Sequence, residues 1–389
     1  MISTGIVSLL LAAPSSATLL WATSYNDHTV TSLNLDKNSL TVLSKSLDCG
    51  SEPTWLTLDK PKSLLYCLNE GWGGAASITS YKTNNDGSLS ALDVLPVLKS
   101  PVSSTLYGPN KGNLAVAHYD TSTFSSFTVR DPSDIALTGN VTYTLDKPGP
   151  DPNRQEVPHL HDAILDPTGR FIAVPDLGAD LIRLFAIEGD AWKEIPPAQA
   201  VSGSGPRHGG FARLGGNTFF YTVNELSNTV TGYKVTYNAD STLSFKLLFD
   251  YSDHGEGGSV PAGTKAAELE ISPDNRFVIL SSRGENSLEI DNFDATNSTK
   301  IPSDPIISFR INPWNGALTL TQVAPAGGRN PRGFTLNKAG TLVASALQDD
   351  NRVVIYKRDV RSGKLGDLVA WATVGEGENN GPNYVIFNE

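Results

Sequence analysis

Short apolar segments separated by polar turns recur along this chain at a spacing of roughly fifty residues. Each unit consists of an apolar strand, a turn rich in Asp, Pro, Asn and Gly, a second apolar strand, then a third strand and a more polar fourth. Gly or Asn in each turn supplies the positive φ that a hairpin requires. The first two strands of the unit occur six times, at residues 54–67, 104–116, 163–174, 210–221, 269–280 and 334–344.

The two ends of the chain together supply a seventh unit. Residues 19–25, 29–35 and 40–45 have the pattern of a second, third and fourth strand with no first, whereas residues 381–387 have the pattern of a first strand with nothing after it. Joining them closes a ring and removes open sheet edges. Four-stranded sheets stacked face to face around an axis also bury both of their faces. The sequence therefore predicts an all-β, seven-bladed β-propeller whose first blade is completed by the C-terminal strand.

The first seventeen residues have the pattern of a secretion signal. Their apolar run, residues 6–13, is too short to span a bilayer. Ser15 and Ala17 are the small residues that precede a cleavage after Ala17. The segment contains no Lys or Arg, and the alternative is a buried first strand. We expect residues 1–17 to be a signal peptide and residues 18–389 to form one secreted, extracellular domain without a membrane span.

Two further features accord with secretion. Asn140 and Asn297 each begin an Asn-X-Thr acceptor for N-glycosylation, in the runs Asn-Val-Thr and Asn-Ser-Thr. Cys49 and Cys67 are the only cysteines, an even number for an oxidising compartment. They either form a disulfide or remain as two partly buried thiols.

The charge of the chain limits the classes of molecule that it is expected to bind. The formal net charge is −11, and Lys and Arg are not clustered. Binding to the phosphate backbone of nucleic acid requires such clusters, so DNA and RNA are not expected partners. We expect a small molecule instead.

Polar side chains gather where first strands begin and second strands end, which are the points nearest the axis of a propeller. His159 and His161 precede the third repeat and, in strand geometry, point to one face. A neutral His can take a proton from water, although a His–Asp hydrogen bond that fixes a loop is the alternative. No third ligand stands at the spacing of a zinc site, so we expect no metal.

Arginine is placed at the same points in the following repeats. Arg207 begins the fourth repeat and Glu225 ends its second strand, so the two side chains could face each other, whether as a site or as a buried structural ion pair. Arg283 and Arg332 occupy corresponding positions in the fifth and sixth repeats. Three arginines around one channel would suit an anion or a developing oxyanion.

Together these segments resemble the seven-bladed lactonase family, which includes bacterial-type 6-phosphogluconolactonases and fungal carboxy-cis,cis-muconate cyclases. The resemblance implies a site at the channel mouth, formed by His161, Arg207, Glu225 and Arg283, without metal or cofactor. The segments that carry it are residues 154–161, 175–180, 204–208, 223–228, 271–277, 282–287 and 331–334.

We therefore expect a metal-independent lactonase that hydrolyses a sugar-acid (aldono) lactone outside the cell. His161 would act as general base, and Arg207 and Arg283 would stabilise the oxyanion. Glu225 would hold an arginine or bind a substrate hydroxyl. His159, His208 and Arg332 would be additional substrate contacts. The alternatives are a lactone-forming carboxymuconate cyclase, and a propeller that binds a ligand without catalysis.

Overall fold

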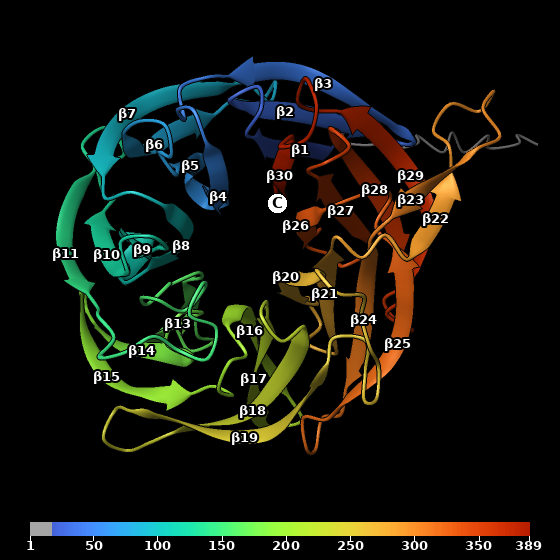
Figure 1. Ribbon diagram of the computed structural model, residues 1–389. Coiled ribbons are helices and arrows are strands. Elements are labelled where there is room, and N and C mark those ends of the chain that lie inside the picture. The colour runs from blue at the N-terminus through green and yellow to red at the C-terminus, as the bar shows by residue number, and fades with distance from the viewer. Residues whose placement is uncertain (1–17) are drawn as a thin grey trace, which may run out of the picture.

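The computed structural model describes residues 18–389, which form a ring of seven four-stranded antiparallel sheets (Figure 1). The expected all-β, seven-bladed propeller is confirmed. The proposed signal peptide, residues 1–17, lies outside the described residues. Each sheet runs outward from a strand at the axis. Blade 1 has the order β3-β2-β1-β30 and is built from β1 (Thr18–Ser24), β2 (Thr29–Asp36), β3 (Ser39–Ser46) and β30 (Pro382–Phe387).

Blades 2 to 4 follow in chain order. Their strands are β4 (Pro53–Asp59), β5 (Leu64–Asn69), β6 (Ala76–Thr83), β7 (Leu89–Val97), β8 (Pro101–Tyr107), β9 (Asn113–His118), β10 (Thr123–Thr128), β11 (Ala136–Thr142), β12 (Ile164–Leu165), β13 (Phe171–Asp176), β14 (Leu181–Glu188) and β15 (Ala191–Gln199). The turns after β4 and β8 contain single 3-10 turns, η1 (Lys60–Lys62) and η2 (Pro109–Lys111).

Blades 5 to 7 complete the ring. Their strands are β16 (Pro206–Leu214), β17 (Asn217–Asn224), β18 (Thr229–Tyr237), β19 (Leu243–Ser252), β20 (Lys265–Ile271), β21 (Phe277–Arg283), β24 (Pro305–Ile311), β25 (Leu318–Pro325), β26 (Pro331–Leu336), β27 (Leu342–Leu347), β28 (Arg352–Arg358) and β29 (Leu365–Thr373). An additional hairpin, β22 (Leu288–Asp291) and β23 (Lys300–Ser303), interrupts blade 6 between its second and third strands and projects from the rim of the ring. The repeat pattern did not predict this hairpin.

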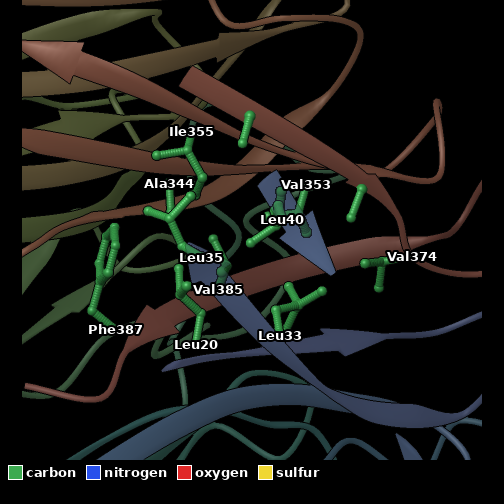
Figure 2. Close-up of a cluster of buried hydrophobic side chains, with 14 residues drawn as sticks. Leu20, Leu33, Leu35, Leu40, Ala344, Val353, Ile355, Val374, Val385 and Phe387 are labelled. Carbon is green, nitrogen blue, oxygen red and sulfur yellow. The ribbon is translucent and has the colours of Figure 1, made fainter. Parts of the chain in front are cut away.

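The C-terminal strand closes the ring. β30 pairs antiparallel with β1, with Leu20 opposite Phe387 and Ala22 opposite Val385. Figure 2 shows the apolar cluster at this junction, which brings Leu20 and Leu33 from the N-terminal strands into one core with Val385 of β30 and Val353 of blade 7. All six residues of β30 are buried. The first and last segments of the chain thus share one core.

A β-bulge shapes the start of most innermost strands. Five of them begin with a proline. Proline lacks an N–H group and is tolerated at the first position of a strand, where no ladder hydrogen bond has to be donated. The residue after each proline has no partner on the neighbouring strand, so it is an extra residue whose side chain is turned toward the axis. These bulge residues are Thr54, Val102, Arg207, Arg332 and Asn383. The bulges therefore decide which side chains line the channel.

The structure joins Cys49 and Cys67 in a disulfide with a Cα–Cα distance of 5.9 Å. Cys49 lies in the connection from blade 1 to blade 2, and Cys67 lies on β5. The bridge fastens this connection to the next blade, and both residues are fully buried. Of the two alternatives left by the sequence, the structure contains the bridged one.

The two glycosylation acceptors are both exposed. Asn297 lies in the tip of the β22–β23 hairpin, as a loop acceptor should. Asn140 lies on β11, the outermost strand of blade 3. Glycosylation at either residue stays a prediction. Over residues 18–389 we find no helix with the length and apolarity that crossing a bilayer would require.

Deletion of residues 381–389 is expected to prevent folding. The deletion removes Val385 and Phe387 from the junction core, and each buried side chain of this size contributes about 1.5–3 kcal/mol. Losing the whole strand is comparable with a typical total stability of about 5–15 kcal/mol. The measurement is the thermal melt followed by circular dichroism, with deletion of Glu389 alone as control. A normal melt of the longer deletion would contradict ring closure by β30.

Candidate active site

A cavity of about 290 Å³ opens where first strands begin and second strands end. Its wall comes from blades 2 to 7. Val102, His161 and Arg332 stand at its floor, because they also line the narrow passage below it. The remaining wall residues are Glu70, Trp72, Tyr119, Asp120, Arg154, Glu225, Lys265 and Arg283. Three of the four predicted catalytic residues therefore line one cavity.

Glu225 is the centre of the charged wall. It directly follows β17 and is only 6% exposed. One of its oxygens, Oε1, accepts a hydrogen bond of 2.7 Å from Arg154. The other, Oε2, lies 3.0 Å from Arg283 Nη2 and 3.0 Å from Arg207 Nε. One carboxylate thus holds three guanidinium groups, which is the first of the two roles expected for Glu225.

This clustering alters the pKa values of the groups. Burial would raise the pKa of Glu225, but Arg283, Arg207 and Arg154 outweigh it and hold the pKa well below its ordinary value. Burial lowers the pKa of Arg283 to about 9, an effect that Glu225 opposes and that Arg207 and Arg332 reinforce. The wall therefore has more positive charge than Glu225 can balance. Such a wall favours an anion or an oxygen that becomes negative.

The arginines differ in how accessible they are. Arg207 is 2% exposed and donates from Nη1 to the carbonyl oxygen of Ala267 at 2.7 Å, so it lies beneath the cavity wall. Arg332 reaches the cavity with its guanidinium over the ring of Tyr25. Among residues 18–389, Arg332 has no carboxylate within ion-pairing distance, whereas Arg207 and Arg283 both pair with Glu225. Arg332 is thus the freer donor, which the sequence had ranked below the other two.

His161 belongs to a buried row of three side chains. Its Nδ1 lies 3.2 Å from Nε2 of His208, and Nδ1 of His208 lies 2.6 Å from Oε1 of Glu268. The exposed fractions of the three residues are 5%, 2% and 3%. No partner for Nε2 of His161 occurs in the described part of the chain. Since His161 lines the cavity, this nitrogen is the one available to a substrate or to water.

Burial also controls the protonation of this row. Burial and then Arg207 lower the pKa of His161 well below its ordinary value and that of His208 to about 3. Burial raises the pKa of Glu268 to about 8, although Arg207 and the amide of Leu269 oppose the shift. Neutral imidazole is therefore the stable form of His161, as a general base requires.

His159 is placed away from the cavity. Its ring stacks on Tyr119 with 4.2 Å between centroids, and its two ring nitrogens lie 3.1 Å from the carbonyl oxygen of Tyr119 and 3.2 Å from Glu156. Tyr119, not His159, lines the cavity. The expectation that His159 contacts substrate is replaced by a supporting role, because Tyr119 stands between its ring and the cavity.

Sequence reasoning missed residues both in the cavity wall and in the passage below it. Glu268 interrupts an apolar first strand, a signal that was available but that the repeat, counted from Leu269, left out. Trp72 lies at the rim with an exposed fraction of 51%, and its Nε1 donates to Glu70 at 2.7 Å. It follows the second strand of blade 2, which contributed little to the family resemblance. Within residues 18–389, no group of three or more His, Cys, Asp or Glu side chains is arranged to hold a metal ion.

Comparison with known proteins decides the family. Residues 19–379 match the family model described as "Lactonase, 7-bladed beta-propeller". This chain belongs to that family. The expected resemblance is thereby confirmed over nearly the whole chain.

Relatives within the lactonase family share moderate sequence identity with the chain. It is 29% identical over 318 residues to the "Probable 6-phosphogluconolactonase" of Arthroderma benhamiae, covering 81% of this chain and 76% of that protein. It is 31% identical to the 6-phosphogluconolactonase of Formosa agariphila over 66% of each chain. The solved periplasmic gluconolactonase of Pseudomonas aeruginosa superposes with a TM-score of 0.76 at 22% identity, over 96% of this chain and 99% of that one. This last likeness shows the shared fold.

Replacing Glu225 with Gln is expected to destabilise the protein strongly. Removing one partner of a buried ion pair typically costs about 3–5 kcal/mol, and here three arginines lose their counterion. Because the folded-state pKa lies below the ordinary value of 4.5, this stabilisation is present above that pH and lost as the pH falls. Denaturant unfolding should show a difference from wild type that is constant above about pH 5 and shrinks below it. Glu188→Gln, on an exposed position, is the control.

Proposed function

We propose that this protein hydrolyses a sugar-acid lactone outside the cell, without a metal. The observation that carries the proposal is one cavity in which Nε2 of His161 faces the same space as the guanidinium of Arg332, a guanidinium that no carboxylate within residues 18–389 pairs with. Ester hydrolysis requires both functions, a base for water and donors for the oxyanion. Membership of the lactonase family supports the same reaction.

The roles of the residues follow from their positions. Nε2 of His161 would take a proton from water, and the resulting hydroxide would attack the lactone carbonyl carbon. Arg332 and Arg283 would stabilise the negative charge on the carbonyl oxygen until the ring C–O bond breaks. The ring oxygen would then receive a proton and leave as a hydroxyl group. Glu225 and Arg207 would position the other arginines, since their own contacts already occupy them.

The setting of the cavity supports a sugar as substrate. Trp72 presents an apolar ring at the rim, beside the polar groups of Glu70 and Asp120. Apolar surface with a few convergent polar groups is common in small-molecule sites. A phosphorylated lactone, as the names of the relatives specify, is a pathway intermediate that is not expected outside the cell. The expected signal peptide therefore favours an unphosphorylated aldonolactone.

Replacing His161 with Asn is expected to lower turnover by about a hundredfold to ten-thousandfold, because it removes the base while keeping a similar shape.

Replacing Arg332 with Gln is expected to lower kcat by about a hundredfold to a thousandfold, the usual loss for one oxyanion donor. The assay is a pH-stat measurement on glucono-δ-lactone, a phosphorylated aldonolactone and a carboxymuconate, each against a buffer blank.

His28→Asn, on an exposed turn, is the matched control for His161→Asn and should be fully active. Acid release from the phosphorylated lactone alone would move the substrate assignment to that compound. Turnover of the carboxymuconate alone would replace hydrolysis with cyclisation. A folded His161→Asn variant with full activity would show that the base has been assigned wrongly.

A further inference from the structure

The row formed by His161, His208 and Glu268 links three successive blades. His161 precedes β12, His208 lies on β16 and Glu268 lies on β20. The facing ring nitrogens of His161 and His208 are 3.2 Å apart, and the other ring nitrogen of His208 lies 2.6 Å from the carboxyl group of Glu268. All three residues are at least nine-tenths buried. Only the His161 end of the row reaches the mouth cavity. The mechanism above uses that end and gives no role to the other two groups.

We propose that Glu268 is the final proton acceptor of this site, and that His161 and His208 conduct the proton between Glu268 and the cavity. The proposal rests on lactone hydrolysis as the function and adds two positioning residues to it. His208, expected from the sequence to contact substrate, becomes the middle of the relay, because both of its ring nitrogens already have partners.

The hydrogen-bond pattern allows two states of the row. With Glu268 ionised, His208 donates from Nδ1 to the carboxylate, and His161 donates from Nδ1 to Nε2 of His208. The cavity then faces a bare Nε2 of His161, which is a base. With Glu268 protonated, it donates to Nδ1 of His208, whose Nε2 donates to Nδ1 of His161. The cavity then faces an N–H group of His161, which is an acid.

The two states differ by one proton, and the hydrolytic step balances accordingly. Water loses a proton to Nε2 of His161, the two inner protons each shift along the row, and Glu268 becomes neutral. The hydroxide left in the cavity forms a bond to the carbonyl carbon. When the ring C–O bond breaks, the shifts reverse and the ring oxygen takes the proton. The new carboxylic acid loses its proton to solvent.

Charge placement favours this transfer. During the step, one negative charge leaves the buried carboxyl group of Glu268 and appears in the cavity beside Arg332 and Arg283. No imidazolium persists beside Arg207, since burial and then Arg207 already lower the pKa of both histidines. The raised pKa of Glu268, about 8, accords with a carboxyl group that readily holds a proton.

Other titratable groups also act on Glu268. Arginines from blades 5, 6 and 7 favour its ionised form, whereas ionised Glu268 raises the pKa of the acidic groups that face it from blades 4, 6 and 1. The groups concerned are Arg207 and His208 on β16, Arg283 on β21, Arg332 on β26, Asp162 before β12, Glu270 on β20 and Tyr384 on β30.

The direct test is the tautomer of His161 across pH, observed by ¹⁵N NMR of imidazole-labelled protein without substrate. In the wild type, His161 should carry its proton on Nε2 below about pH 8 and on Nδ1 above it, with the change following Glu268. In Glu268→Gln the change should be absent, and in the exposed control Glu188→Gln it should remain. A single tautomer throughout in the wild type, or a change that survives in Glu268→Gln, would overturn the relay.

Stability gives a second measurement that does not depend on activity. The pKa of Glu268 is raised on folding, so its contribution is full below the ordinary value of 4.5 and is lost as the pH rises toward about 8. Glu268→Gln resembles the neutral acid and should lack this loss. Its melting temperature should therefore equal or exceed that of the wild type at alkaline pH. A marked drop there would show that the ionised carboxylate supports the fold, against the proposal.

Kinetics on glucono-δ-lactone separate this inference from the function itself. Wild-type kcat should rise with an apparent pKa near 8, and Glu268→Gln should lower kcat by about a hundredfold or more and remove the rise. His208→Asn should do the same, with KM little changed. An inactive wild type would defeat the proposed function while leaving the NMR test valid. An active wild type with a fully active, folded Glu268→Gln would defeat the relay alone.

Discussion

The pairing of β30 with β1 is the constraint on which the rest of the molecule depends. It joins segments from the two ends of the chain, Leu20 with Phe387 and Ala22 with Val385, into one sheet and one core. Only a closed ring brings the seven innermost strands to a common axis. The side chains at the starts of these strands then converge, although they are separated by dozens of residues in sequence. The mouth cavity is a consequence of closure.

Within the ring, local backbone geometry determines which side chains meet. A bulge after the first proline of β16 and of β26 turns Arg207 and Arg332 toward the axis. The same device in blades 2 and 3 presents Thr54 and Val102, which are small or apolar. The positive charge is therefore confined to one side of the mouth, where Glu225 gathers three arginines. A buried arrangement of this kind contributes little net stability, so we attribute its presence to chemistry at the cavity.

Much of this could be predicted from the sequence, for a physical reason. Strand starts and ends are marked by turn residues, and polar groups at those points stand out against apolar strands. His161, Glu225 and Arg283 were found in this way and do line one cavity. The ranking of the arginines could not be predicted, because the full burial of Arg207 and the partial exposure of Arg332 at the cavity depend on neighbouring blades. Glu268 was left out because the repeat was counted from Leu269, and its 2.6 Å contact with His208 forms only where blade 6 packs on blade 5, which the sequence pattern does not show.

We propose that a lactone binds with its carbonyl group between His161 and Arg332. The most direct measurement is a crystal structure with the δ-lactam of gluconic acid, which has the shape of the lactone but resists hydrolysis. We predict the lactam in the mouth cavity, with its carbonyl oxygen hydrogen-bonded to the guanidinium of Arg332 and its carbonyl carbon facing Nε2 of His161. A lactam bound elsewhere on the propeller, or bound here with its carbonyl turned away from both residues, would rule out this binding mode.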